Sequence, residues 1–302
     1  MWGLVMRNTA LALVLAATLS WSATAQADEP KTEPAVHRPV LSPTGNQIAY
    51  MVLVNEDWEL FLSNADGSDP RRLTDHAGWD GYATWAPDGK SLVFDHGEAG
   101  SKMKQPYVIA LDDQATSMFH EYQGWVSVSD WLADGSMIGS HEREPDIPRD
   151  LVRIDGTTGE LKYITETPDR SEGDAVVSPD GKTIFFFERI NEKSNLAKID
   201  IATGKRENIY AAQDRGYGTA ISPDGQNIAF VDVQPGEENS DIFVLSLESG
   251  EVRRLTTDPS WDHMPIWTGD GSAIIFTSYR SGVERPYLVT LSGAETYPLK
   301  LP

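Results

Sequence analysis

Short apolar runs, rich in β-branched and aromatic side chains, recur along the chain after residue 36 and are separated by polar turns. Runs of this kind are typical of buried β-strands, and we find no convincing helical pattern between them. The first series of expected strands lies at 47–50, 91–94, 183–187, 227–230 and 273–276. A further strand is expected after each inner hairpin, at 59–63, 106–111, 151–155, 196–201, 242–247 and 286–291, and a fourth is clearest at 71–74 and 253–256.

A turn with the sequence Pro-Asp-Gly, or a close variant, precedes each strand of the first series. Proline presets φ at the second position of a type I turn, and glycine accepts the left-handed conformation that follows. The Asp-Gly pairs are therefore assigned to folding and not to catalysis. The turn glycines are Gly45, Gly89, Gly135, Gly181, Gly225 and Gly271, at intervals of 44, 46, 46, 44 and 46 residues.

Six copies of a four-stranded unit with this period predict an all-β fold, a six-bladed β-propeller with four antiparallel strands per blade. The propeller is expected to span residues 37–302, with no blade completed by a strand from the opposite terminus. Trp85, Trp131 and Trp267 stand four residues before a turn glycine and are expected to be buried between neighbouring blades.

The N-terminal residues predict export. Residues 1–27 read as a signal peptide, with Arg7, an apolar stretch at 10–19 and small residues before the cleavage site. The apolar stretch is too short for a bilayer-spanning helix, which needs about 20 residues. Residues 28–36 read as an extended lead-in. We expect a cleaved, periplasmic protein without membrane insertion, and because the chain has no cysteine, neither a disulfide nor a lipoprotein anchor is expected.

The charge balance excludes some partners. The chain has 46 acidic and 25 basic residues, a formal net charge of −21. Such a protein repels nucleic acids and anionic membrane surfaces, so no nucleic-acid partner is expected.

Loop residues at one rim of the predicted propeller are candidates for binding. Tryptophans stand ten residues before three turn glycines, and acidic residues stand nine before three of them. Aromatic side chains at such positions either pack on the next blade or offer a surface to a sugar or peptide. The predicted binding residues at the rim and channel mouth are Trp79, Asp80, Trp125, Glu172, Trp261, Asp262 and His263.

Histidines also fall at or near this rim. They are His37, His76, His96, His120, His141 and His263, with Asp80, Asp95, Glu142, Glu172, Asp174 and Asp262 as candidate companions. Imidazole with carboxylate suits a transition metal, but no His-Glu-x-x-His motif is present and the linear spacing assigns no metal. We expect no cofactor other than a structural Ca²⁺ that carboxylates could hold in the channel.

The residues also resemble a known family. The segment 80–90, together with Arg253-Arg254-Leu255-Thr256 ahead of Asp262, is similar to the WD40-like PD40 repeat of the periplasmic TolB propeller. The resemblance implies a propeller that docks envelope proteins. TolB also carries an α/β domain ahead of its propeller, which the short lead-in does not supply. Peptidase relatives append an α/β-hydrolase domain with a Gly-x-Ser-x-Gly elbow, and that pentapeptide does not occur in this sequence.

Two functions follow as hypotheses. The first is a non-catalytic, monomeric scaffold in the periplasm that binds an envelope protein or peptide at its rim and channel mouth, and is not an enzyme. The alternative is a secreted carbohydrate-active enzyme, similar to a polysaccharide lyase, with its site at the channel mouth. In that alternative an arginine neutralises a substrate carboxylate and a histidine or tyrosine removes the α-proton. The candidates are Arg38, Arg189, Arg215 and Arg280 for the first task, and His263, Tyr217 and Tyr279 for the second.

Overall fold

The computed structural model describes residues 34–145, 147–293 and 296–301, which lie within one compact unit, Glu33–Pro302. The predicted signal peptide and most of the predicted lead-in fall outside the described residues. Within them the regular secondary structure is entirely β. None of the described segments forms a helix with the length and apolar character needed to cross a bilayer.

The strands form one eight-stranded sheet and four four-stranded sheets. The first sheet holds β1 (Val36–Leu41), β2 (Gln47–Val54), β3 (Asp57–Asn64), β4 (Arg71–Arg72), β5 (Gly78–Trp85), β6 (Ser91–Glu98), β7 (Gln105–Ala110) and β8 (Thr116–Met118). The second holds β9 (Trp125–Trp131), β10 (Met137–Glu142), β11 (Asp150–Ile154) and β12 (Leu161–Tyr163). The third holds β13 (Ser171–Val177), β14 (Thr183–Ile190), β15 (Lys193–Asp200) and β16 (Arg206–Ala211). The fourth holds β17 (Tyr217–Ile221), β18 (Asn227–Val233), β19 (Ser240–Ser246) and β20 (Val252–Arg254), and the fifth holds β21 (Asp262–Trp267), β22 (Ala273–Ser278), β23 (Arg285–Thr290) and β24 (Thr296–Pro298).

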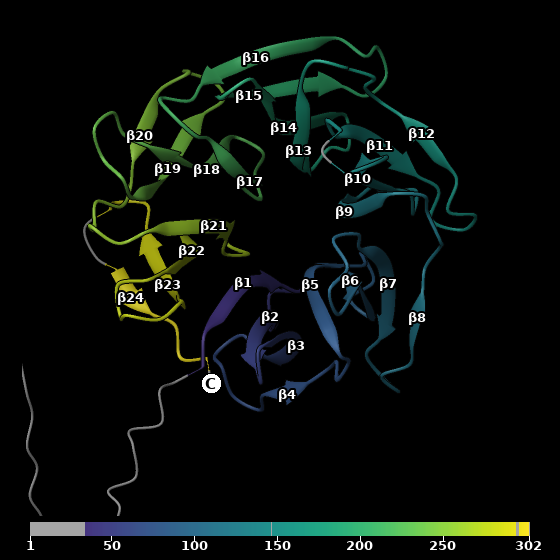
Figure 1. Ribbon diagram of the computed structural model, residues 1–302. Coiled ribbons are helices and arrows are strands. Elements are labelled where there is room, and N and C mark those ends of the chain that lie inside the picture. Colours follow the sequence, from purple (N-terminus) through teal and green to yellow (C-terminus); the bar gives the residue numbers. More distant parts are fainter. Residues whose placement is uncertain (1–33, 146, 294–295, 302) are drawn as a thin grey trace, which may run out of the picture. The chain divides into compact units, whose positions relative to one another are not determined.

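Consecutive strands pair antiparallel within each group of four, as the sequence predicted. The first sheet is larger because one parallel pair, Trp58 with Trp79, joins β3 to β5. Figure 1 shows the sheets arranged around a centre, with β1, β5, β9, β13, β17 and β21 innermost and β4, β8, β12, β16, β20 and β24 at the periphery. The fold is therefore an all-β propeller built from antiparallel four-stranded units.

The predicted turns form as expected. Each turn glycine has φ between +67° and +84°, the left-handed region that glycine adopts without steric cost. In the first turn the Gly45 amide donates to the Ser42 carbonyl at 2.8 Å, and the other five turns repeat this bond.

Most inner strands also bend at a second left-handed residue, seven positions before the turn glycine. Arg38, Tyr82, Asp174 and Met264 have φ between 48° and 53° there, and Gly218 has φ of 66°. The strand pairing shifts register at each of these points, which marks a β-bulge. In β9 the register shift lies opposite Ile138 and Gly139 instead, without a left-handed residue.

Tryptophans link neighbouring inner strands. The Trp85 indole donates to the Val40 carbonyl at 3.1 Å, and the Trp267 indole donates to the Ala220 carbonyl at 3.0 Å. Both side chains are buried, as predicted. Trp131 is only partly buried, and its Nε1 has no hydrogen-bond partner among the described residues.

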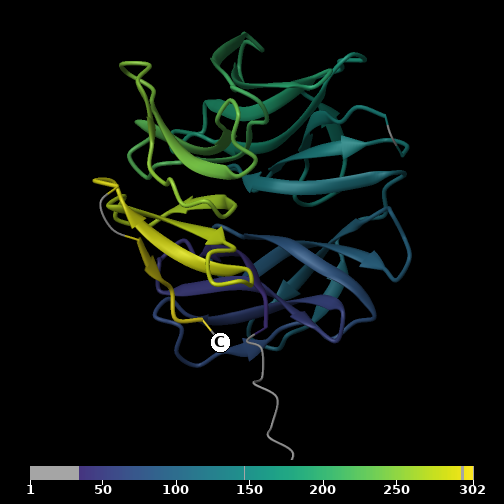
Figure 2. The same ribbon diagram turned by 60° about the vertical axis from the view of Figure 1, so that its left-hand side comes forward.

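The first and last sheets meet through side chains and one backbone bond. Val36, Ile48 and Tyr50 of the first sheet pack with Ile275 of the fifth and with Leu301. The Val36 amide donates to the Glu284 carbonyl at 2.9 Å. Figures 1 and 2 show the last strands, in yellow, beside the first strands, in purple. Each sheet is made of consecutive strands, so no described strand crosses from one end of the chain into the sheet at the other.

A buried carboxyl group lies between the first and second sheets. Asp95 on β6 is 1% exposed and accepts a hydrogen bond of 3.1 Å from the Trp125 indole on β9, while its Oδ1 lacks a partner among the described residues. Burial raises the pKa of Asp95 to about 6, although Ser127, Trp125 and the nearby Lys104 offset part of this effect.

The indole hydrogen bonds predict that replacing tryptophan by phenylalanine lowers stability more at one position than at another. Trp267→Phe leaves the Ala220 carbonyl without its donor, so the free energy of unfolding should fall by about 1–2 kcal/mol in urea titrations. Trp131→Phe is the matched control, since its indole N–H makes no such bond, and it should cost less. Equal losses for the two variants would show that the indole bond is unimportant.

The Asp95 carboxyl predicts a pH dependence of stability. Its folded pKa lies above the usual 3.8, so its protonated form favours the folded state. That stabilisation is complete below about pH 4 and is lost as pH rises through about 6, by up to about 3 kcal/mol. Asp95→Asn should therefore reduce the fall in unfolding free energy between pH 4 and 7. An unchanged pH profile in the variant would contradict a raised pKa.

Candidate functional site

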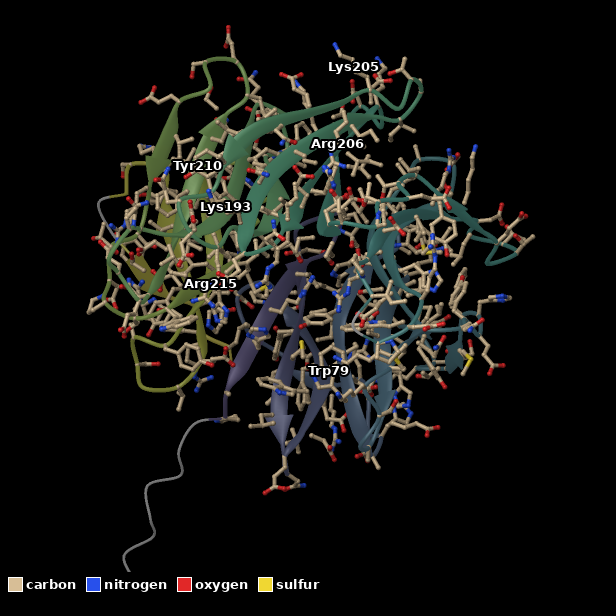
Figure 3. All side chains as sticks on the ribbon, turned by 45° about the horizontal axis from the view of Figure 1, so that its top comes forward. Trp79, Lys193, Lys205, Arg206, Tyr210 and Arg215 are labelled. Carbon is tan, nitrogen blue, oxygen red and sulfur yellow. The ribbon has the colours of Figure 1, made fainter. Side chains whose placement is uncertain are left out.

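We call the mouth face the side at which the inner strands begin and the second strands end. Antiparallel pairing brings these strand ends together. Trp79, Trp125 and Trp261 lie there at the start of β5, at the start of β9 and just before β21, as their position in the repeat predicted. Figure 3 shows Trp79 on the first sheet and Arg215 in the loop before β17.

A pocket of about 450 Å³ opens on the mouth face between the third and fourth sheets. Gly216 forms part of its wall and approaches Phe187 closely, because a Cβ at this position would lie 2.3 Å from the Phe187 ring. The Trp261 side chain is 45% exposed at the edge of the pocket. The polar and aromatic residues of its lining include Arg149, Asp174, Arg189, Arg215, Tyr217 and Trp261.

Two arginines of this pocket are available to a ligand. Arg189 and Arg215 are exposed, Arg189 has no ion pair within the described part of the chain, and Arg215 meets only Asp214 at 4.0 Å. Arg149 is instead held by Glu142 at 2.9 Å and lies 4.2 Å from the Trp125 ring. Guanidinium groups bind carboxylates through two parallel hydrogen bonds, so the pocket suits an anionic group.

A lysine that the repeat pattern did not single out brings two of the predicted tryptophans together. The Lys104 ammonium lies 3.2 Å from the centre of the Trp79 ring and 4.8 Å from that of Trp125. Burial lowers the pKa of Lys104 to about 8, with nearby Asp95 acting in the opposite direction. The ammonium therefore shields part of both aromatic faces from solvent at this edge of the mouth.

The acidic residues predicted at the rim are buried, although Glu172 lines the mouth pocket. Asp80, Glu172 and Asp262 are at most 1% exposed, so they do not face solvent. Successive strand residues point to opposite sides, so Asp80 and Asp262 turn into the sheet after the mouth-facing Trp79 and Trp261, and Glu172 takes the same repeat position after Ser171. Asp80 bonds to His76 and His96, Glu172 to Arg206, and Asp262 to Arg280 through two bonds of 2.7 and 2.9 Å. Because it is paired with Asp262, Arg280 is not available to bind a substrate carboxylate.

The centre of the ring holds a narrow cavity of about 140 Å³. Its lining includes the left-handed residues Arg38, Tyr82, Asp174 and Met264, and the Arg38 guanidinium stacks on the Tyr82 ring at 4.1 Å. Asp174 also lines the mouth pocket, so the two cavities adjoin. It is the one carboxylate among the described lining residues of the channel cavity, which gives the predicted structural Ca²⁺ a single acidic ligand there; that ion stays a prediction.

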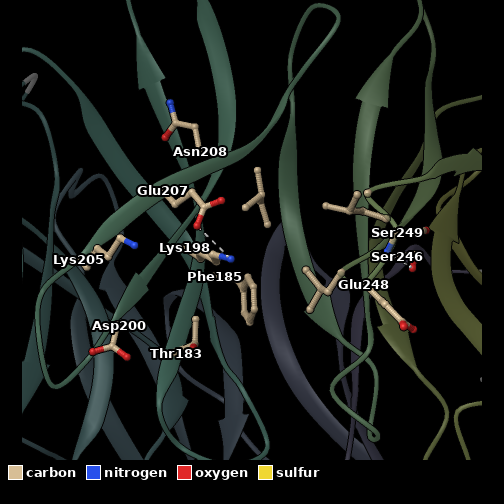
Figure 4. Close-up of a pocket in the computed structure, with 14 residues that line it drawn as sticks. Thr183, Phe185, Lys198, Asp200, Lys205, Glu207, Asn208, Ser246, Glu248 and Ser249 are labelled. Carbon is tan, nitrogen blue, oxygen red and sulfur yellow. Dashed lines mark hydrogen bonds and ion pairs between the residues drawn. The ribbon is translucent and has the colours of Figure 1, made fainter.

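The opposite face carries a wider groove of about 690 Å³ between the turns of the third and fourth sheets (Figure 4). Its charged lining is internally paired in part, with Lys198 3.2 Å from Glu207. Most of its other residues belong to β14, β15, β16 and β19, and the rest, such as Lys205 and Ser249, lie in the turns between strands. The groove offers alternating charges and no concentration of one sign.

The histidines gather into groups that sequence spacing did not reveal. His37, His263 and Glu284 form one cluster, and His76, Asp80 and His96 form another. His141 bonds to the Tyr163 hydroxyl and to the Gln123 carbonyl, and His120 packs on Tyr122. The sequence did not single out Glu284 and Lys104. Both lie in loops between the second and third strands of a unit, and the lengths of these loops differ from unit to unit.

Comparison with known proteins gives peptidases as relatives. The chain is 26% identical to dipeptidyl-peptidase 5 of Porphyromonas endodontalis over 219 residues, covering 67% of this chain and 30% of that protein. It is 24% identical to dipeptidyl-peptidase 5 of Porphyromonas gingivalis over 316 residues, covering 83% and 46%. The chain thus spans less than half the length of these relatives. Their names contradict the predictions of a non-catalytic scaffold and of a protein that is not an enzyme.

Solved structures show the same fold. TolB from Acinetobacter baumannii is 19% identical with a TM-score of 0.69, over 89% of this chain and 64% of that chain. A puromycin-hydrolyzing peptidase of Mycobacterium tuberculosis is 13% identical with a TM-score of 0.61, over 89% and 46%. The family model of the TolB beta propeller domain, PD40, matches residues 23–213 and 175–300. The chain therefore belongs to the TolB beta propeller family.

Proposed function

We propose that this chain is a substrate-binding propeller of the peptidase type, and that its mouth pocket takes the carboxylate end of a peptide. The observation that carries the proposal is the pair of exposed arginines, Arg189 and Arg215, beside the exposed Trp261 in a pocket of about 450 Å³. Relatives named dipeptidyl-peptidase support the choice of a peptide over other carboxylates.

The pocket has the chemistry of binding. Arg189 and Arg215 supply the donors for a terminal carboxylate, and Trp261 with Tyr217 supplies aromatic surface for an adjacent side chain. Among the described residues that line the pocket there is no histidine, so its serines have no imidazole base to activate them. In this proposal the pocket holds and orients a peptide, and no side chain of the pocket acts as a nucleophile.

Local charge favours this ligand in spite of the net charge of −21. Many acidic side chains lie far from the mouth, in the hairpin turns, whereas Arg38, Arg189 and Arg215 line the mouth pocket or the adjoining channel cavity. Carboxylates also line the pocket, but Glu172 and Glu188 are paired with Arg206 and Asp174 accepts a bond from the Gly218 amide, so the exposed arginines remain available to attract an anionic ligand. A peptide carboxylate is thus drawn to the pocket while polyanions are repelled by the remaining surface.

The same proposal takes the propeller to have six blades. The eight-stranded sheet then counts as two blades, β1–β4 and β5–β8, because only the parallel pair Trp58–Trp79 joins them. We further propose that the protein is a monomer that a signal peptide at residues 1–27 directs to the periplasm. Its partner in this proposal is a peptide and not a nucleic acid.

Removal of both pocket arginines tests the proposal. Arg189→Ala with Arg215→Ala should weaken binding of N-terminally labelled tetrapeptides by about tenfold or more in fluorescence anisotropy, because charge-assisted hydrogen bonds to the carboxylate are lost. The same peptides with amidated C-termini should bind the native protein about as weakly.

Lys182→Ala with Lys205→Ala is the matched control, since it removes two positive charges from hairpin turns at the other ends of the strands. This variant should keep the native affinity. Equal weakening in both double variants would reduce the effect to net charge, and the absence of any peptide binding by the native protein would reject the proposal.

A further inference from the structure

We propose that His37, His263 and Glu284 form a binding site for a divalent transition metal ion, Zn²⁺ by preference, where the first and last sheets meet. This site is separate from the mouth pocket and does not depend on the proposed function. His37 lies on β1, His263 lies on β21, and Glu284 directly precedes β23. The three ligands therefore come from both ends of the chain.

The distances between the ligand atoms fit a tetrahedral ion. His37 Nδ1 and His263 Nε2 each lie 3.2 Å from Glu284 Oε1, and all three atoms lie within 4.8 Å of one another. In a tetrahedral zinc site with bonds of about 2.0–2.1 Å, neighbouring ligand atoms are about 3.3 Å apart. Only a small movement of the two rings is needed to bring both nitrogens to one ion.

The two ring nitrogens contact the same Glu284 oxygen but make no well-aligned hydrogen bond with it. His37 Nδ1 and His263 Nε2 are fully buried atoms that make no hydrogen bond within the described part of the chain. Native structures contain few buried polar atoms without a hydrogen bond. A metal ion would satisfy both nitrogens and the carboxylate at once.

Surrounding groups hold the ligands in place. The Glu284 carbonyl accepts the Val36 amide at 2.9 Å, which fixes the backbone beside its carboxylate. The His37 ring packs on Trp58 with centroids 5.7 Å apart, and the His263 ring stacks on Tyr279 at 5.9 Å. The side chains of His37 and His263 are 14% and 12% exposed, so both rings lie close to the solvent.

The second histidine cluster differs in this respect and provides a control. His76 Nδ1 and His96 Nδ1 already bond to the two oxygens of Asp80, at 2.9 and 2.6 Å. Their hydrogen-bonding needs are met within the protein. This arrangement explains the buried carboxylate of Asp80 without a metal ion.

The ligand set selects the class of ion. Two imidazole nitrogens and one carboxylate oxygen suit zinc and other first-row transition ions. Ca²⁺ and Mg²⁺ prefer oxygen ligands, and Ca²⁺ needs six to eight of them. The three protein ligands leave one position of a tetrahedral ion to water.

The test is titration of the chelator-treated full chain with ZnCl₂ by isothermal calorimetry, with CaCl₂ as a comparison. The native protein and the His76→Ala/His96→Ala variant should each bind one Zn²⁺ with equal affinity. His37→Ala/His263→Ala should bind at least about a hundredfold more weakly, because two of three ligands are gone. Co²⁺ bound to the native protein should show the visible absorption of tetrahedral coordination.

Glu284→Gln keeps the shape of the side chain, so it tests the proposed site even if the His37→Ala/His263→Ala variant fails to fold. It should lose affinity for Zn²⁺ by about tenfold or more and should lose the rise in unfolding temperature that Zn²⁺ gives the native protein. Native protein without zinc affinity, or zinc binding unchanged in Glu284→Gln and in His37→Ala/His263→Ala, would overturn the proposal.

Discussion

Left-handed backbone at one repeated position controls how the sheets pack around the centre. Arg38, Tyr82, Asp174 and Met264 all adopt it, although none is glycine, and each such residue costs about 1–3 kcal/mol. The bulge that accompanies it bends the strand and increases its twist, which lets neighbouring sheets face each other across a shared core. Burial of the side chains between the sheets offsets this strain. The same bulges place Arg38, Tyr82, Asp174 and Met264 in the lining of the channel cavity.

The positive charge available at the mouth depends on which arginines are already paired with buried carboxylates elsewhere. Several buried carboxylates are held by an arginine of the same sheet or of a loop that joins its strands, as in Glu59 with Arg72, Asp241 with Arg254 and Asp262 with Arg280. In a chain with 25 basic residues these internal pairs use a substantial part of the positive charge. An arginine without such a partner among the described residues, like Arg189, is therefore available for a ligand.

The sequence predicted the local structure well, because proline, glycine and alternating apolar residues act within a few residues of one another. The hairpin turns, the antiparallel four-stranded units and the buried Trp85 and Trp267 all formed as expected. Asp80, Glu172 and Asp262 did not face the solvent, because the pleat turns the side chain at this repeat position inward. Glu284 and Lys104 could not be placed, since loops of unequal length carry no periodic signal. The function predicted from the absence of a hydrolase motif was wrong, because the fold's relatives are named peptidases.

The junction between the first and last sheets has a consequence for the order of folding. Hydrogen-bonded strand pairs in the described structure join segments close in sequence, so each sheet can form from local contacts at a small loss of chain entropy. Contacts between Val36 and Glu284 join residues 248 positions apart. These contacts stabilise the fold only after the intervening sheets have formed. Ring closure is therefore expected to be the last step of folding and the first to reverse.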